Sequence, residues 1–191
     1  DVKLNAAETE IVSHTAVKTP SDWIFSDFDR IFDDVIGKLK MNAKVYDMFG
    51  HSAGSQVLQR LTLFGLSDKV NRMLAANSGW YTMIDFEQPF PFGLKDAMVT
   101  KDQVKAAFQA KLILYLGEQD NKNETRGDLA IGPNIDLQGD SRFTRGQYFF
   151  KHAKATAKKL GVTFNWKMVF VPGIGHSQKK ISVPAAAYLY L

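Results

Sequence analysis

The run Gly50-His51-Ser52-Ala53-Gly54 places a serine between two glycines, at a spacing typical of enzymes that use a serine hydroxyl as nucleophile. In this pattern the serine lies on a strained turn between a strand and a helix, and small flanking residues let the backbone expose the hydroxyl. The motif alone is weak evidence, because about one chain in fifteen of this length contains it by chance. It gains weight here because it follows a predicted strand and precedes a predicted helix. Ser52 is therefore the candidate nucleophile, and the alternative is a glycine turn with an unreactive serine.

A serine hydroxyl is a poor nucleophile at neutral pH, so it needs a base within hydrogen-bond reach. Of the chain's four histidines, His14 precedes the predicted sheet, His51 is adjacent to the serine, and His152 lies within a predicted helix. His176 alone follows a predicted strand, in a turn bracketed by glycines. Loops at the carboxyl ends of parallel strands bring catalytic side chains together. We therefore predict His176 as the base, with a surface-loop histidine as the alternative.

The acid that orients this base is expected after another strand and between the serine and the histidine in the chain. Asp120 fits, because it follows Gly117 at the end of a predicted strand. Within the same loop, Glu118, Asp128, Asp136 and Asp140 compete for the role. The predicted chemistry is acyl transfer, in which Ser52 attacks an ester carbonyl and the backbone N–H of Ala53 helps to hold the oxyanion. The sequence does not identify the second oxyanion donor.

Hydrophobic periodicity predicts helices that alternate with short strands. Helices are predicted over 25–39, with N-cap oxygens from Ser21 and Asp22, and over 53–63, 100–109 and 146–160, and a last short helix opens at Pro184. Strands are predicted over 43–49, 70–76, 111–116 and 163–171, with one possible strand at 10–17 in an otherwise irregular start. Such alternation predicts an α/β fold, a mostly parallel sheet with helices on both faces. The polar stretch 118–142 is predicted to be a long loop.

The segment 77–94 is too aromatic for an ordinary solvated loop. We expect Trp80, Tyr81, Phe90 and Phe92 to line or cover a substrate pocket, together with His51 beside the serine. The alternative, which sequence alone leaves nearly as strong, is that these aromatic side chains pack in the core.

Composition argues against several other classes of protein. The 24 basic residues are scattered among 20 acidic ones, so the net charge of +4 comes without a dense basic run and no nucleic-acid partner is predicted. The absence of cysteine excludes disulfides, thiolate metal sites and a cysteine nucleophile. The histidines are too dispersed for a zinc site, so neither a metal nor a cofactor is predicted. No apolar run approaches the roughly 20 residues of a membrane-spanning helix.

Taken together, these residues resemble the α/β-hydrolase superfamily and, within it, the poly(3-hydroxybutyrate) depolymerase-like esterases. The segments that carry the resemblance are 21–23, 49–54, 76–83, 91–94, 145–150 and 171–176. The resemblance implies the α/β-hydrolase fold and a triad of Ser52, Asp120 and His176. It also implies a bacterial protein of a kind often exported or lipid-anchored, acting on an apolar or polymeric ester such as a hydroxyalkanoate polyester.

The chain departs from this family upstream of the serine. Such hydrolases place several strands before the motif, including the strand whose loop completes the oxyanion hole, whereas about fifty residues precede Ser52. We interpret residues 1–191 as a single catalytic domain and expect it to be incomplete at the N-terminus, with a further segment or a partner chain completing the sheet. The competing hypothesis is a non-catalytic binding or structural fragment that keeps the hydrolase pattern.

Overall fold

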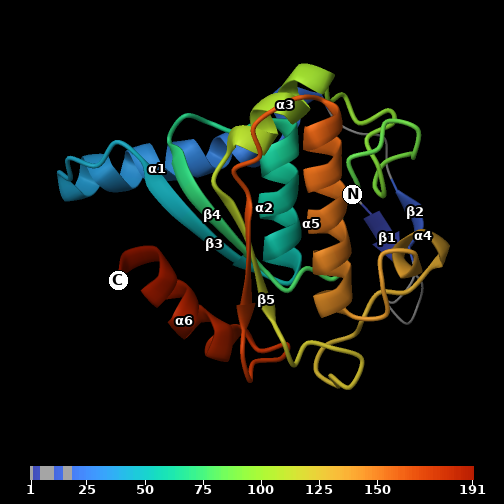
Figure 1. Ribbon diagram of the computed structural model, residues 1–191. Coiled ribbons are helices and arrows are strands. Elements are labelled where there is room, and N and C mark those ends of the chain that lie inside the picture. Colours follow the sequence, from blue (N-terminus) through green and yellow to red (C-terminus); the bar gives the residue numbers. More distant parts are fainter. Residues whose placement is uncertain (1, 5–10, 15–18) are drawn as a thin grey trace.

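A computed structural model of the chain describes residues 2–4, 11–14 and 19–191. The strands are β1 (Val2–Leu4), β2 (Ile11–His14), β3 (Tyr46–His51), β4 (Val70–Ala76), β5 (Leu112–Gly117) and β6 (Lys167–Val171). The helices are η1 (Pro20–Asp22, 3-10), α1 (Phe25–Leu39), α2 (Ala53–Phe64), α3 (Lys101–Gln109), α4 (Pro133–Asp136), α5 (Arg142–Lys159) and α6 (Gln178–Tyr190). β3, β4, β5 and β6 form, in that order, a parallel sheet, while β1 and β2 pair antiparallel. This sheet confirms the predicted α/β class (Figure 1).

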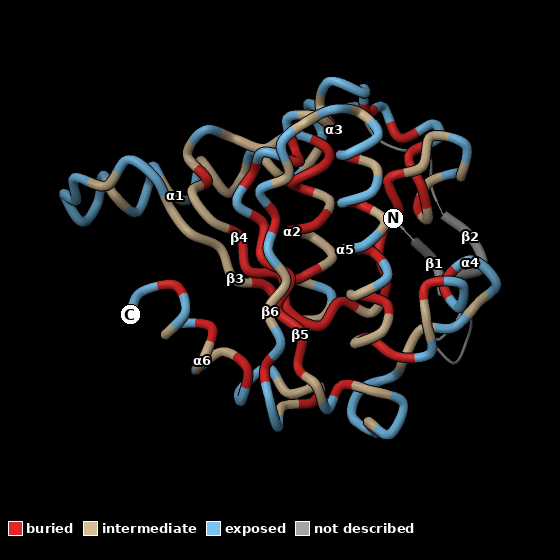
Figure 2. The backbone as a smooth tube through the Cα atoms, in the orientation of Figure 1, coloured by how far each residue is buried: buried red, intermediate tan, exposed pale blue. Residues whose placement is uncertain are grey.

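The central strands are buried on both sides, so their residues alternate between two hydrophobic clusters. On β4, Met73 and Ala75 belong to the cluster formed with α2, α3 and α5, whereas Leu74 and Ala76 belong to the cluster formed with α6. Figure 1 shows these three helices on one face of the sheet and α6 on the other, and Figure 2 shows the buried residues concentrated between them. Helices therefore cover both faces, as predicted.

Helix α1 is less covered than its sequence pattern predicts. Its first turn contacts the core through Phe25 and Phe28, but Ile31, Val35 and Leu39 are 61%, 41% and 66% exposed. The helix lies against the start of β3, which pairs with β4 on one side and with no strand on the other among the residues that the structure describes. One side of β3 therefore has free backbone hydrogen-bonding groups beside an exposed apolar helix face.

Capping residues explain where the observed helices depart from the predicted ones. The predicted cap by Ser21 and Asp22 is wrong, because both lie in η1 and α1 begins only at Phe25. The last helix does not open at Pro184 but begins at Gln178, after the N-cap Ser177, and contains the proline. A helix begun by its own cap can accommodate a proline at the cost of one backbone hydrogen bond.

Other boundaries differ as well. Strand β3 spans Tyr46–His51 rather than 43–49, because its pairing with β4 begins at Tyr46 and continues to His51. Helix α5 begins at Arg142 rather than at 146, because Ser141 and Thr144 form a capping box. Strand β6 begins at Lys167 rather than at 163. At the N-terminus, β2 lies inside the possible strand 10–17, whose residues 10 and 15–17 are outside the described residues, and β1 was not predicted. No helix among the described residues is both long and apolar enough to cross a membrane.

The same substitution is expected to have opposite effects at two helical glycines. A Cβ at Gly146 on α5 would lie 2.6 Å from the Leu116 side chain, which is fully buried, whereas a Cβ at Gly37 on α1 would meet nothing within 4 Å. Gly37→Ala is expected to raise the free energy of unfolding by about 0.5–1 kcal/mol through helix propensity. Gly146→Ala is expected to lower it by about 1 kcal/mol or more, because overpacking outweighs that gain. Urea unfolding of both variants measures these changes. Equal changes in the free energy of unfolding would contradict the close approach of α5 to β5.

Candidate active site

Ser52 lies at the strained strand-to-helix turn that its motif predicts. Its backbone has φ 56° and ψ −116°, a region that residues with side chains rarely adopt, and its N–H donates to Ala76 O at 2.9 Å. A Cβ on Gly50 would lie 2.5 Å from Gly54 O, so only glycine fits where β3 meets the first turn of α2. Ala53 is the first residue of α2, so its N–H has no acceptor within the helix.

The structure brings Asp120 and His176 together from turns that follow neighbouring strands. Asp120 lies in the turn after β5 and is 1% exposed, and His176 lies in the turn between β6 and α6. The distance from His176 Nδ1 to Asp120 Oδ2 is 2.7 Å. When the carboxylate is ionised, this bond keeps a proton on Nδ1 and leaves Nε2 of a neutral imidazole as a hydrogen-bond acceptor.

The four competing acidic residues do not contact His176. Asp136 pairs with Arg145, and Asp140 accepts a hydrogen bond from Thr144. The carboxylates of Glu118 and Asp128 make no hydrogen bond or ion pair within the described part of the chain. Among the acids of the loop 118–142, the carboxylate that faces the imidazole is that of Asp120.

Sequence reasoning missed Arg142, the residue on the far side of Asp120. Its guanidinium Nη1 lies 3.3 Å from Asp120 Oδ1, and both side chains are almost completely buried. Its Nη2 donates to the carbonyl oxygens of Gly127 and Asp128, at 2.9 and 2.7 Å. The capping box Ser141-x-x-Thr144 marks Arg142 as the first residue of α5, but it does not indicate that the side chain reaches Asp120.

His51, predicted to bind substrate, packs against the proposed base. The rings of His51 and His176 have centroids 4.5 Å apart, and His51 Nε2 is buried without a hydrogen-bond partner in the described structure. Burial lowers the pKa of His51 to about 4, and the nearby His176 and Arg142 act in the same direction. His51 is therefore neutral at pH 7 and adds no charge beside His176.

This depressed pKa makes His51 a source of acid sensitivity. Between its unfolded value near 6.5 and its folded value near 4, the unfolded chain binds a proton that the folded chain excludes, so stability falls as pH falls through this window. His51→Gln removes this titration, and its free energy of unfolding is expected to decline less than that of the wild type from about pH 7 to about pH 5. Urea unfolding at both pH values measures the two declines. A variant that declines as steeply as the wild type would contradict the assignment.

The structure places two of the predicted pocket aromatics in the core. Tyr81 is fully buried and stacks on Phe149 with centroids 4.5 Å apart, and Trp80 is 5% exposed beneath the Arg60 guanidinium. Direct substrate contact by these two side chains is therefore not supported. The side-chain amides of Gln59 on α2 and of Gln138, which follows α4, bind the backbone of segment 81–82 and hold it in the core.

The other two pocket aromatics are only partly buried. Phe92 packs on Trp80, and Phe90 packs on Phe64 near the C-terminal end of α2. Arg60, which lies over the rings of Trp80 and Phe90, is eight residues from Ser52, or about 12 Å along the helix. The rings of Trp80 and Phe90 therefore cover the half of α2 that lies farther from Ser52.

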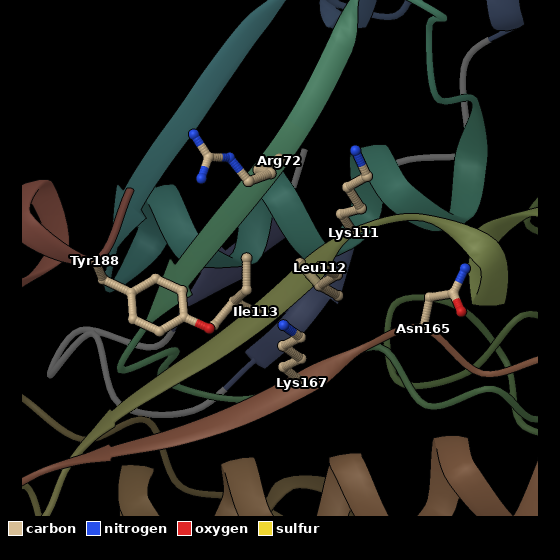
Figure 3. Close-up of a pocket in the computed structure, with 7 residues that line it drawn as sticks. All are labelled: Arg72, Lys111, Leu112, Ile113, Asn165, Lys167 and Tyr188. Carbon is tan, nitrogen blue, oxygen red and sulfur yellow. The ribbon is translucent and has the colours of Figure 1, made fainter. Parts of the chain in front are cut away.

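A separate basic pocket lies at the opposite ends of the strands. It has a volume of about 230 Å³ and is lined by Arg72, Lys111, Leu112, Ile113, Asn165, Lys167 and Tyr188 (Figure 3). Residues from the amino-terminal parts of β4, β5 and β6 line it, whereas Ser52, Asp120 and His176 follow carboxyl-terminal strand ends. Within the described residues, no cluster of three or more His, Cys, Asp or Glu side chains could hold a metal ion.

Comparison with solved structures identifies the superfamily. The chain matches poly(aspartic acid) hydrolase-1 from Sphingomonas sp. KT-1 with 31% identity and a TM-score of 0.84, over 91% of this chain and 66% of that one. It matches a poly(3-hydroxybutyrate) depolymerase from Bordetella parapertussis with 27% identity and a TM-score of 0.82, over 98% of this chain and 60% of that one. It thus spans less than two thirds of the length of each. No family model and no curated protein matches the sequence. The chain belongs to the α/β-hydrolase superfamily and resembles its poly(3-hydroxybutyrate) depolymerase-like esterases.

Proposed function

We propose that the chain carries the catalytic part of a serine hydrolase that cleaves carboxylic esters through an acyl-enzyme. The observation that carries this proposal is the strained turn at Ser52, at the same edge of the sheet as the hydrogen-bonded pair of Asp120 and His176. A backbone strained at a nucleophile and a buried carboxylate bound to a histidine are together more specific than either alone. The hydrolase names of the two solved relatives add support.

The proposed reaction proceeds in two steps. Nε2 of His176 accepts the proton of the Ser52 hydroxyl as Oγ attacks the ester carbonyl, and Asp120 stabilises the imidazolium. The oxyanion accepts a hydrogen bond from the N–H of Ala53 and, as the carbonyl re-forms, the alcohol leaves with the proton from His176. A water molecule then gives a proton to His176 and attacks the acyl-serine, which releases the acid and restores the hydroxyl.

We propose a polymeric or apolar ester as the substrate, with a hydroxyalkanoate oligoester as the first choice. One solved relative is named for poly(3-hydroxybutyrate) and the other for poly(aspartic acid), so the two polymers are the natural comparison. Release of 3-hydroxybutyrate units but not of aspartate would support this choice. A series of p-nitrophenyl esters then tests the shape of the acyl site, because equal rates from acetate to decanoate would argue against an apolar pocket.

The free side of β3 supports a proposal about the second oxyanion donor. Among the described residues, no strand pairs with the backbone groups on this side, which lies near α1. We propose that a further strand pairs there, supplied by another segment or by a partner chain, and that its loop provides the second N–H.

Covalent labelling of the whole chain by a fluorophosphonate tests the proposed function. The expected result is an intact mass raised by one probe group, with the adduct on Ser52 after digestion. A folded chain, verified by circular dichroism, that takes up no probe would reject the enzyme and favour the non-catalytic binding or structural fragment.

A further inference from the structure

The carboxylate of Glu124, in the loop between β5 and α4, is bound to the backbone of the proposed base. Its Oε2 accepts a hydrogen bond from the N–H of His176 at 2.6 Å, although the two residues are 52 positions apart. The side chain is only 5% exposed. Its Oε1 accepts the backbone N–H groups of Thr125 and Arg126, and the Arg126 guanidinium binds both oxygens. These bonds fix the carboxylate, so it holds His176 from a rigid position.

Glycines give this carboxylate and the neighbouring backbone room to approach the histidine. A Cβ on Gly175 would collide with Glu124 Oε2, so the bond to His176 depends on a glycine there. Gly127 has φ 67°, and a Cβ on it would lie 3.0 Å from His176 Cδ2 and 3.5 Å from Nε2. The loop therefore binds the backbone N–H of His176, and at Gly127 it passes close to the ring edge that carries Nε2.

Other buried groups hold this arrangement in place. Arg142 binds the carbonyl oxygens of Gly127 and Asp128 with the same guanidinium that contacts Asp120. From the opposite side, the fully buried Asn77 donates to Gly175 O at 3.3 Å and accepts the N–H of Gly117 at 2.9 Å. The turn that carries His176 is thus tied to β4, to the loop after β5 and to α5.

We propose that the segment 124–128 is a clamp for His176, in which Glu124 acts as a positioning residue that aims Nε2 at Ser52. The catalytic consequence rests on the proposed function. His176 lies in a turn without secondary structure of its own, so external bonds set its position. A misplacement of about 1 Å at a catalytic group reduces turnover by roughly a hundredfold, which sets the scale of the expected effect.

The clamp is expected to stay charged over the working range of an esterase. Hydrogen bonds from Arg126, the largest cause, lower the pKa of Glu124 to about 2, and the N–H of His176 acts in the same direction. The charged groups that face His176 are therefore Asp120, Glu124 with its partner Arg126, and Arg142 behind Asp120. His51 packs on the ring as a neutral group.

Glu124→Ala and Glu124→Gln, made in the whole chain, test the clamp with two independent readouts. In Glu124→Ala, hydrogen exchange at the His176 amide is expected to accelerate by about tenfold or more. The fluorophosphonate labelling rate and kcat are expected to fall by about 10- to 100-fold, with KM changed less than about threefold. Glu124→Gln keeps an amide oxygen that can accept the His176 N–H but loses the ion pair with Arg126, so it is expected to fall in between. Glu118→Gln makes the same change on the same loop at a side chain without described partners and serves as the matched control.

The outcomes separate the clamp from the proposed function. Unchanged exchange at His176 in folded Glu124→Ala would overturn the clamp. Faster exchange with labelling and kcat within about twofold of the wild type would overturn the positioning role. If the wild type is never labelled but exchange accelerates in the variants, the clamp stands and the proposed function fails. If the alanine variant does not fold, the same criteria apply to Glu124→Gln.

Discussion

Ser52→Ala is expected to abolish ester hydrolysis, with kcat reduced by at least about ten-thousandfold, and to prevent labelling by the fluorophosphonate. Without the hydroxyl no acyl-enzyme forms, and the oxyanion donor and substrate binding alone give only residual catalysis. The Ser52 side chain makes no described hydrogen bond that folding would lose. The free energy of unfolding is therefore expected to stay within about 0.5 kcal/mol of the wild type.

Ser55 provides the matched control, one helical turn further along α2. Its hydroxyl is fully buried and lies 2.5 Å from the hydroxyl of Ser78. Ser55→Ala is expected to lower stability by about 1 kcal/mol while activity and labelling persist, because this serine is bound to the core and not to the site. Rates with a p-nitrophenyl ester and urea unfolding give both quantities for each variant. If Ser52→Ala retained the wild-type rate, the proposed nucleophile would be wrong.

Asp120→Asn is expected to reduce kcat by about a thousand- to ten-thousandfold and, at the same time, to destabilise the fold. The catalytic loss arises because an amide neither fixes the required tautomer of His176 nor stabilises its charged form. The loss of stability, about 3 kcal/mol, arises because Arg142 keeps its charge in a buried site without its anionic partner. Steady-state kinetics and urea unfolding of the single variant measure the two effects.

The double variant Asp120→Asn with Arg142→Met separates these two effects. Removal of the unpaired guanidinium is expected to restore most of the lost stability, since the buried charge is gone, while hydrolysis stays near the level of Asp120→Asn. Recovery of hydrolysis would show that Asp120 acts mainly through the fold. If stability is not recovered, the hydrogen bonds of Arg142 to the carbonyl groups of Gly127 and Asp128 stabilise the fold more than its ion pair with Asp120 does.

Short sequence motifs predicted the fold class and the turn at Ser52, because neighbouring residues determine both. The glycines around Ser52 and the alternating strands and helices were sufficient for the fold class, because a tight turn and a parallel sheet each have a sequence pattern. The strand-end positions of Asp120 and His176 followed from the same pattern. The sequence could not separate Asp120 from the other acids of its loop. Two contacts in the structure distinguish it: its N–H donates to Gly117 O, and its carboxylate binds His176.

Contacts between distant segments could not be predicted in the same way. Glu124 reaches His176 across 52 residues, and Arg142 reaches Asp120 across 22, and neither pair has a local signature. The sequence also could not decide between pocket and core for the aromatic residues of segment 77–94, for another reason. A stacked core ring such as Tyr81 and a pocket-lining ring have the same composition and spacing, so only burial distinguishes them.

The free side of β3 also bears on how the chain behaves in concentrated solution. An open parallel strand is a template whose recognition is made by the peptide backbone, and it therefore accepts many different sequences. Ile31 and Leu39 are exposed on α1, whose Phe32 packs on Tyr46 at the start of this strand, so hydrophobic contact adds to strand pairing. A net charge of +4 opposes association only through screened repulsion, which salt weakens. Association of the isolated chain through this edge is thus expected to depend on salt, and not on how firmly the core is folded.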